Sequence, residues 1–430
     1  MSRRKKIVFL LHNAYAIGGT VRTTLNLASA LADHHDVEIA SMARHLDEPR
    51  FTVDPRVRLV PLVDIRPYSP DLRDPAQAQP ATDFPAEDKR HRQYSRLTDL
   101  RVRAYLAGCD ADVVIGTRPG INVYVSRFAP RRALRIAQEH LRHDAHTKQL
   151  RKVLARHYRT LDAVVTTTAA DAAVYRARMK LPGVRVMSVP NIVPEATVAP
   201  SDCTAPVIAA AGRLARGKRF DLLLEAFATV APKEPDWQLR IYGGGKQQGR
   251  LETLIQDLGL TDRAHLMGPH TPIEEEFARA SIVVSASDAE SFGMTLVEAM
   301  RCGVPVVSTD CPLGPAEIIT DGVDGRLVPV DDPHALADAL LDLTADPSLR
   351  RAMGRAALAS AHRYDPAPIV SKYEHLFAEL RETRLQRTWE RGATRAKGWL
   401  RRRVRAWKRP TSASFRGAGN CASNHKQPAA

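Results

Sequence analysis

The sequence predicts a two-domain α/β protein in which each domain contains a doubly wound parallel sheet. The 430 residues exceed what one ordinary hydrophobic core supports. Short apolar runs alternate with amphipathic helical segments in both halves of the chain, as in repeated βαβ units. Residues 194–206, PEATVAPSDCTAP, interrupt this alternation with the composition of a linker. We therefore expect domains at 1–193 and 207–364.

The first half opens as a βαβ unit, with the tight loop Gly18–Gly19 between its first strand and first helix. The helix is expected at 21–32, and strands at 7–12, 36–41, 112–116, 133–138, 163–167 and 184–189. Residues 64–95 are rich in Pro, Asp and Gln and poor in aliphatic side chains. They are expected to form a long loop or a partly ordered insertion.

The second half restarts the alternation after the linker. Strands are expected at 207–211, 238–242, 264–267, 281–285, 304–307, 317–319 and 326–330. Helices are expected at 220–230 and 248–258, and residues 333–380 should close the fold as helices.

The composition is that of a soluble globular protein, with 44% hydrophobic and 26% charged residues. No apolar run reaches the length of a membrane span. The basic start is expected to lead into the first strand rather than to act as a secretion signal. The five cysteines are scattered and form no C-x2-C pair, which favours a cytoplasmic location and argues against a structural zinc site.

Positive charge is concentrated near the C-terminus of a chain whose net charge is +15. Residues 381–410 contain twelve Arg or Lys and two acidic residues, Glu382 and Glu390. Apolar residues recur there at helical spacing, from Trp389 to Trp407. This basic amphipathic helix suits an anionic membrane surface, with an anionic polymer or a solvated tail as alternatives. Residues 411–430 are expected to be disordered.

The strongest functional signal lies in 287–310, SDAESFGMTLVEAMRCGVPVVSTD. Glu290 is expected on the loop between a strand and a helix, and Glu298 inside that helix. In an open parallel sheet, ligands bind beyond the carboxyl ends of the strands. The helix is expected to offer free N–H groups to an anion at Ser291, Phe292 and Gly293.

The spacing of Glu290 and Glu298 corresponds to roughly 9–12 Å of mostly helical chain. That is about the span from a sugar ring, across a diphosphate, to a ribose. Two carboxylates with backbone amides between them would therefore suit the binding of a nucleotide sugar. An ordinary α/β turn with two solvated glutamates is the alternative.

Two further segments favour a phosphate-bearing ligand. Arg213 and Lys218 lie in the loop that starts at Gly212, after a strand and before a helix, where they would suit a diphosphate. A solvated basic loop is the alternative. Gly243-Gly244-Gly245 also follows a strand, and Gly244 would let a nucleotide pack closely. The backbone of 265–268, including Met267, is a candidate for contacting the base.

These motifs together resemble the retaining, nucleotide-sugar-dependent glycosyltransferases of family 4, which have the GT-B fold. The E-x7-E signature of that family is similar to Glu290–Glu298, and further elements are similar to 212–218, 241–245 and 18–20. The resemblance covers roughly 5–375 and is strongest from 205 to 335.

The resemblance implies two Rossmann-like domains facing across a cleft, with a helix at about 365–380 crossing back to the first domain. It implies that Arg213 and Lys218 neutralise the donor diphosphate in place of a metal ion, so that no metal or other cofactor is needed. It also implies that Glu290 holds the donor sugar and Glu298 the ribose. UDP is the commonest donor nucleotide of the family.

On the N-terminal side, His140 ends an expected strand and, by the resemblance, contacts the donor sugar. Gly18, Gly19 and Thr20 are candidates for the donor or acceptor loop, with a simple turn as the alternative. His143 and His146 have a spacing that superficially suggests a metal site, but no matching carboxylate set accompanies them, and we expect solvated histidines.

Two acidic segments invite other interpretations. Asp110-Ala-Asp112 resembles a metal-binding D-x-D motif, but it precedes a strand, so a turn is expected. Residues 310–317 form a loop at the cleft mouth that either helps to select the donor sugar or is a plain turn.

The sequence therefore predicts a metal-independent retaining glycosyltransferase. It would move a sugar from a nucleoside diphosphate donor to a cell-envelope glycan, wall polymer or lipid-linked acceptor at the inner face of the plasma membrane. Nucleic acid is not expected as a partner. The alternatives are a membrane- or polyanion-binding protein on a non-catalytic GT-B scaffold, or a GT-B epimerase or phosphorylase.

Overall fold

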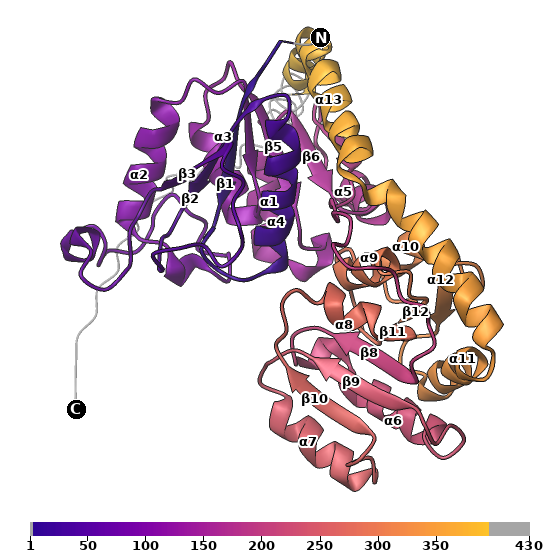
Figure 1. The fold of residues 1–430 in the computed structure, drawn as a ribbon. Coiled ribbons are helices and arrows are strands. Elements are labelled where there is room, and N and C mark those ends of the chain that lie inside the picture. Colours follow the sequence, from indigo (N-terminus) through magenta and orange to yellow (C-terminus); the bar gives the residue numbers. More distant parts are fainter. Residues whose placement is uncertain (1–2, 395–430) are drawn as a thin grey trace, which may run out of the picture.

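The computed structural model describes residues 3–394, which form two lobes, each built on a parallel sheet (Figure 1). The N-terminal sheet has the order β3-β2-β1-β4-β5-β6-β7. Its strands are β1 (Lys6–Leu11), β2 (Asp36–Ser41), β3 (Val57–Pro61), β4 (Val113–Gly116), β5 (Leu134–Glu139), β6 (Ala163–Thr166) and β7 (Arg185–Ser188). Its helices are α1 (Gly19–Ala32), α2 (Arg96–Ala107), α3 (Pro119–Phe128), α4 (Lys148–Tyr158) and α5 (Ala169–Arg178).

The C-terminal sheet has the order β10-β9-β8-β11-β12-β13. Its strands are β8 (Val207–Ala211), β9 (Gln238–Tyr242), β10 (Ala264–Gly268), β11 (Ile282–Ser285), β12 (Val306–Thr309) and β13 (Gly325–Val328). Its helices are α6 (Phe220–Val230), α7 (Gln248–Asp257), α8 (Glu274–Ala278), α9 (Met294–Arg301), α10 (Pro315–Ile318), α11 (Pro333–Ala345) and α12 (Pro347–Ala361).

Every strand pair in both sheets is parallel, which confirms the predicted pair of doubly wound domains. The strand order reverses direction between β1 and β4 in the first sheet and between β8 and β11 in the second. Loops leaving these strands diverge to opposite faces, and the resulting crevice is where such sheets bind ligands.

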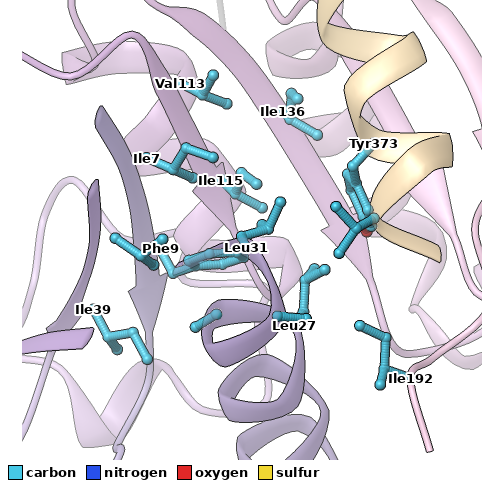
Figure 2. Packing of buried hydrophobic residues seen from close by; sticks show 14 of the residues in the cluster. Ile7, Phe9, Leu27, Leu31, Ile39, Val113, Ile115, Ile136, Ile192 and Tyr373 are labelled. Atoms are coloured by element: carbon cyan, nitrogen blue, oxygen red, sulfur yellow. The ribbon is translucent and has the colours of Figure 1, made fainter. Parts of the chain in front are cut away.

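Helix α13 (Pro366–Glu382) belongs to the core of the N-terminal domain although it follows the C-terminal one (Figure 1). Its Ile369, Tyr373 and Phe377 are fully or almost fully buried in the cluster that also contains Ile7 and Leu31. Figure 2 shows Tyr373 beside this cluster. The Nε2 of Gln138 on β5 donates to the Tyr373 hydroxyl at 2.8 Å. The expected return of this helix to the first domain is therefore confirmed.

Two secondary-structure expectations were wrong or incomplete. Residues 317–319 do not form a strand, because Pro315 at the first helical position starts α10. Strand β3 was not predicted, because its Arg and Pro residues weaken the apolar pattern of this edge strand.

The 64–95 segment is a long loop with two short 3-10 turns, η1 (Pro70–Arg73) and η2 (His91–Gln93), and it is well packed. Phe84 stacks on Tyr94 with ring centroids 3.6 Å apart, and both rings are buried. The carboxylate of Asp99 on α2 accepts the N–H groups of Thr82, Asp83 and Phe84. This loop therefore forms a fixed wall next to β1 and α3.

Among the described residues, no helix combines the length and apolar character needed to cross a bilayer.

Candidate active site

A cleft of about 980 Å³ opens between the carboxyl ends of the two sheets. It brings together predicted site residues from both domains, and these are Gly18, Gly19, Thr20, His140, Arg213, Lys218, Gly244 and Glu298. The N-terminal wall is built by the loops after β1, β4 and β5, by the start of α1 and by Arg90 of the 64–95 loop. The C-terminal wall is built by the loops after β8, β9 and β10 and by α9.

Lys218 and Glu290 form an ion pair on the C-terminal wall. Lys218 ends the 3-10 turn η4 (Arg216–Lys218) after β8, and Glu290 lies on the loop after β11. The Ser287 hydroxyl donates to Glu290 Oε1 at 2.7 Å and fixes the carboxylate. Glu290 does not itself line the cleft, but it holds the lysine that does.

Glu298 sits on α9 at the base of the cleft and is 6% exposed. Its Oε1 accepts from Nη1 of Arg22 at 2.8 Å, and Nη2 of Arg22 binds Glu274 Oε1 at 2.5 Å. Burial raises the pKa of Glu298, and the Arg22 guanidinium opposes that shift. Arg22 belongs to α1, so the predicted ribose carboxylate is paired with a cation from the opposite domain.

The start of α9 differs from the expectation. The helix begins at Met294, because Gly293 adopts a left-handed conformation with φ 109° and breaks the helical run. Ser291, Phe292 and Gly293 therefore precede the helix, and the first helical N–H groups belong to Met294 and Thr295.

This turn makes one contact within its domain through a side chain and one contact between the domains through its backbone. The Phe292 ring packs edge-on against Tyr364 with centroids 5.5 Å apart. The Ser291 carbonyl accepts from Oγ1 of Thr167 in the N-terminal domain at 2.6 Å. Residues 291–293 do not line the cleft, whereas Thr295 in the first turn of α9 does.

The glycine loop after β9 has a structural reason for two of its glycines. A Cβ at Gly243 would lie 1.9 Å from the Gly212 carbonyl oxygen, and one at Gly245 would lie 2.4 Å from that of Leu214. The loop therefore packs directly on the backbone that carries Arg213. Gly244 lines the cleft between them, whereas the exposed Met267 does not.

On the opposite wall, Gly18 and Gly19 lead into α1, and a Cβ at either position would meet no atom. The space beside them therefore belongs to the cleft. His140 follows β5, and its Nε2 is buried without a hydrogen-bond partner among the described residues. Burial lowers the pKa of His140 to about 4, so the imidazole is neutral and can accept or donate one hydrogen bond to a ligand.

A profile of the family described as glycosyl transferases group 1 matches residues 197–359. This match covers the β8–α12 region, which contains Arg213, Lys218, Glu290 and Glu298. The C-terminal domain is therefore similar to the group 1 glycosyltransferases over this range.

Relatives of this group 1 domain include longer and shorter proteins. An exopolysaccharide phosphotransferase of Streptomyces coelicolor is 36% identical over 396 residues, which are 87% of this chain and 41% of that protein. The chain thus spans less than half of this relative. An uncharacterized glycosyltransferase of Haemophilus influenzae is 24% identical over 86% of this chain and 99% of its own length.

Solved structures share the whole two-domain arrangement. TarM of S. aureus, in complex with fondaparinux, α-GlcNAc-glycerol and UDP, superposes with a TM-score of 0.70 at 17% identity, covering 87% of this chain and 99% of TarM. HepE of Anabaena, in complex with UDP-glucose, gives a TM-score of 0.66 at 19% identity, covering 87% of this chain and 100% of HepE. The expected GT-B fold is thereby confirmed.

Facing the group 1 domain, the N-terminal wall contains three charged or titratable residues that the sequence did not single out: His12, Arg90 and Arg118. His12 is the first residue after β1 and Arg118 the second after β4, positions at the carboxyl ends of strands that could have identified them. Arg90 belongs to the 64–95 loop, where no periodicity indicates which side chains face the cleft.

The expectation of solvated histidines at 143 and 146 was wrong. Both are buried, His143 at 3% and His146 at 6% exposure. His146 Nε2 lies 3.7 Å from Glu139 Oε2, and the His143 backbone N–H donates to Asp171. No group of three or more His, Cys, Asp or Glu side chains suited to a metal ion occurs within residues 3–394.

Asp110 and Asp112 lie at the opposite end of the sheet from the cleft. Asp110 pairs with Lys6, and Asp112 accepts from the Lys6 backbone N–H and from Arg381. They therefore connect β1 and α13 at the turn before β4, as expected.

The described part of the basic segment, residues 381–394, lies on the N-terminal domain. Arg387 is buried against Asp162 at 2.7 Å, and Arg384 donates to the Arg131 carbonyl. Leu385 and Trp389 remain 85% and 74% exposed. The rest of the expected helix, 395–410, and the tail 411–430 lie outside the described residues.

Proposed function

We propose that this protein is a retaining glycosyltransferase that moves a sugar from a nucleoside diphosphate donor, of which a UDP-sugar is our first choice, to an acceptor hydroxyl. The proposal rests on how charged side chains are arranged on the C-terminal wall of the cleft. There Lys218, Arg213 and Glu298 lie along one surface between two Rossmann-like domains. Cations beside a buried carboxylate match a diphosphate beside a ribose.

In the proposed arrangement the ribose hydroxyls donate to Glu298, and Arg22 moves aside or shares the carboxylate. Arg213 and Lys218 bind the diphosphate and stabilise the negative charge that grows as it departs. Glu290 holds the donor sugar, so that the sugar lies close to Lys218. The neutral His140 contacts a sugar hydroxyl. The backbone near Gly244 and Met267 is the candidate base site.

The acceptor hydroxyl would attack the anomeric carbon from the face that the diphosphate leaves, through an oxocarbenium-like state without a protein nucleophile. Catalysis would then consist of positioning and of stabilising the leaving group. Metal independence is part of the proposal, because the two cationic side chains supply charge where other enzymes use a divalent ion.

The acceptor is proposed to be a cell-envelope glycan, wall polymer or lipid-linked glycan. A poly(glycerol-phosphate) α-glucosyltransferase of Bacillus subtilis is 27% identical over 41% of this chain, which supports this class. The phosphotransferase activity in the name of the Streptomyces relative is not carried over, since the chain spans 41% of that protein.

We also propose that the 381–410 segment places the enzyme on the anionic inner face of the plasma membrane. Leu385 and Trp389 supply an exposed apolar surface next to the arginines that bind the N-terminal domain. An amphipathic basic segment binds such surfaces through apolar burial and charge.

The test is a thermal-shift screen of the purified chain, in EDTA, against UDP, GDP, ADP, dTDP and their common sugars. We expect one nucleotide to raise the melting temperature, and we expect the Glu298→Ala variant to lose that shift. If no nucleotide stabilises the chain, the cleft is degenerate, and the basic segment 381–410 becomes the favoured functional region.

A further inference from the structure

The N-terminal wall of the cleft carries more positive charge than a donor diphosphate accounts for. Arg90 from the 64–95 loop and Arg118 after β4 both line it, across from Arg213 and Lys218. Within residues 3–394, Glu298 is the one acidic residue that lines the same cleft, and it is paired with Arg22. Lys218 is paired with Glu290.

Asp88 holds the two arginines in place but does not neutralise both. Its Oδ1 accepts the Arg90 backbone N–H at 2.9 Å, and its Oδ2 accepts the Gly120 backbone N–H at 3.1 Å. Nη2 of Arg118 lies 3.5 Å from Oδ1. One carboxylate thus fixes the backbones of the 64–95 loop and of α3 while meeting one guanidinium at the limit of hydrogen bonding.

The remaining guanidinium contacts are with neutral groups. Nη1 of Arg90 donates to His12 Nε2 at 3.2 Å and to Gln93 Oε1 at 2.9 Å. Nε of Arg118 is buried without a hydrogen-bond partner among the described residues. A buried guanidinium N–H without an acceptor is costly, unless a ligand supplies one.

The charge environment supports a missing anion. Burial and the positive charges of Arg118 and Arg90 lower the pKa of His12 to about 3, so His12 is neutral and its Nε2 can accept from Arg90. Burial together with Arg118 and Arg213 also lowers the pKa of Arg90. Like charges held close together in a desolvated cleft form a site for an anion.

We propose that Arg90 and Arg118 bind an anionic group, a phosphate or a carboxylate, that belongs to the acceptor. This inference rests on the proposed function and deepens it by naming the chemical class of the acceptor. The donor diphosphate is matched by Arg213 and Lys218 on the C-terminal wall. The second pair of cations lies on the opposite wall, which we assign to the acceptor, and a second anion would balance its charge.

The test uses the full chain, empty or saturated with UDP, and three probes that share a three-carbon polyol skeleton. These are sn-glycerol 3-phosphate, glycerate and glycerol, compared at equal ionic strength. Melting temperature is followed as a function of probe concentration. The two anionic probes distinguish a phosphate from a carboxylate site, and glycerol reports any effect of the polyol alone.

We expect at least one anionic probe to stabilise the UDP-loaded protein and glycerol to have no effect. In the Arg90→Gln/Arg118→Gln double variant the half-saturating probe concentration should rise at least tenfold, while the shift caused by UDP persists. Arg92→Gln is the matched control, because Arg92 is exposed on the same loop and does not line the cleft.

Three results would overturn the inference: an equal response to glycerol, an undiminished anion response in the double variant, or loss of the UDP shift in the double variant. The last would assign the arginines to the donor diphosphate. Failure of the proposed function itself looks different, since the wild-type chain would then not respond to UDP. An anion response of the empty protein that requires Arg90 and Arg118 would survive that failure as a binding site.

Discussion

The two walls of the cleft differ in how their charges are balanced. On the C-terminal wall, Lys218 is paired with Glu290, and Glu298 is paired with Arg22, before any ligand is present. On the N-terminal wall, Asp88 meets the Arg118 guanidinium at 3.5 Å but not that of Arg90, and within residues 3–394 the buried Nε–H of Arg118 has no acceptor. The paired charges of the C-terminal wall are preorganised before a ligand binds, whereas the N-terminal wall keeps positive charge that an anion could balance.

This difference follows the origin of the residues. The C-terminal residues come from short loops after β8 and β11 within the matched group 1 domain. Arg90 comes from the long 64–95 loop, which is held by Phe84, Tyr94 and Asp99. The family profile therefore covers the C-terminal wall and leaves the loop that carries Arg90 outside its match.

The largest expected effect comes from removing the paired lysine. Lys218→Ala should lower donor turnover at least tenfold and by up to about 10²–10³-fold, the cost of one preorganised group that stabilises a leaving charge. Hydrolysis of the responding nucleotide sugar would be measured under saturating donor. Arg216→Ala, an exposed change in the same turn, should leave turnover unchanged. Wild-type turnover in Lys218→Ala would remove the site assignment.

The glycines on the two walls should respond in opposite ways. Gly243→Ala should destabilise the protein by about 2–4 kcal/mol, because φ is 144° and the added Cβ would meet the Gly212 carbonyl oxygen. Gly19→Ala should fold normally, because its Cβ meets no atom, and should impair ligand binding instead. Chemical denaturation and nucleotide titration separate the two outcomes. Equal stability of both variants would contradict the packing account.

The buried end of the basic segment should contribute to stability. Arg387→Ala leaves Asp162 with one fewer charged donor and should cost about 2 kcal/mol, as expected for a hydrogen bond to a charged group. Urea unfolding would measure this. Thr388→Ala, on the next and exposed position, should change the unfolding free energy by less than about 0.5 kcal/mol. If the two variants unfold alike, this segment does not depend on the contact with Asp162.

The ion pair that joins the walls should appear in the pH dependence of nucleotide binding. Burial raises the pKa of Glu298, and Arg22 lowers it, so ribose binding by the ionised carboxylate should weaken as the pH falls through that pKa. Arg22→Met removes the opposing charge and should move this loss of affinity to higher pH. Nucleotide affinity measured from pH 5 to 8 would reveal the shift. An unchanged pH profile would show that Arg22 does not affect the ionisation of Glu298.

The smallest expected effect concerns Leu385 and Trp389, the exposed apolar residues of the basic segment. Trp389→Ala should weaken binding to anionic vesicles severalfold, about 1 kcal/mol, because one interfacial aromatic side chain is lost. Co-sedimentation with vesicles would measure the change, with neutral vesicles as the reference. Undiminished binding of this variant would place the membrane contact elsewhere or rule it out.

The sequence was most informative where chemistry and periodicity coincide. Arg213 and Lys218 follow a clear strand and Glu298 lies in a clearly patterned helix, so their place at the cleft could be predicted, whereas Glu290 lies behind Lys218 and does not line the cleft. Gly293 shows the limit, since its left-handed backbone moved the helix start to Met294. Pairing across the domains, as between Arg22 and Glu298, depends on how the two lobes close, and no local pattern indicates it.

The N-terminal half was harder to predict, because its site residues depend on long-range packing. His143 and His146 look like solvated surface residues in the sequence, yet the tertiary fold buries them beside Asp171 and Glu139. Arg90 reaches the cleft because Asp88 ties its backbone to α3. A loop without periodicity conceals such contacts.

The most direct test is calorimetric titration of UDP, in EDTA, into three proteins: wild type, Glu298→Ala and Glu317→Ala. Glu317 is the matched control, because its carboxylate also bridges the domains, to the backbone N–H groups of Ala169 and Ala170, but does not line the cleft. Metal-free UDP binding that is lost in Glu298→Ala and retained in Glu317→Ala is the predicted result. Equal binding by all three proteins would contradict the assignment of the C-terminal wall as the nucleotide site.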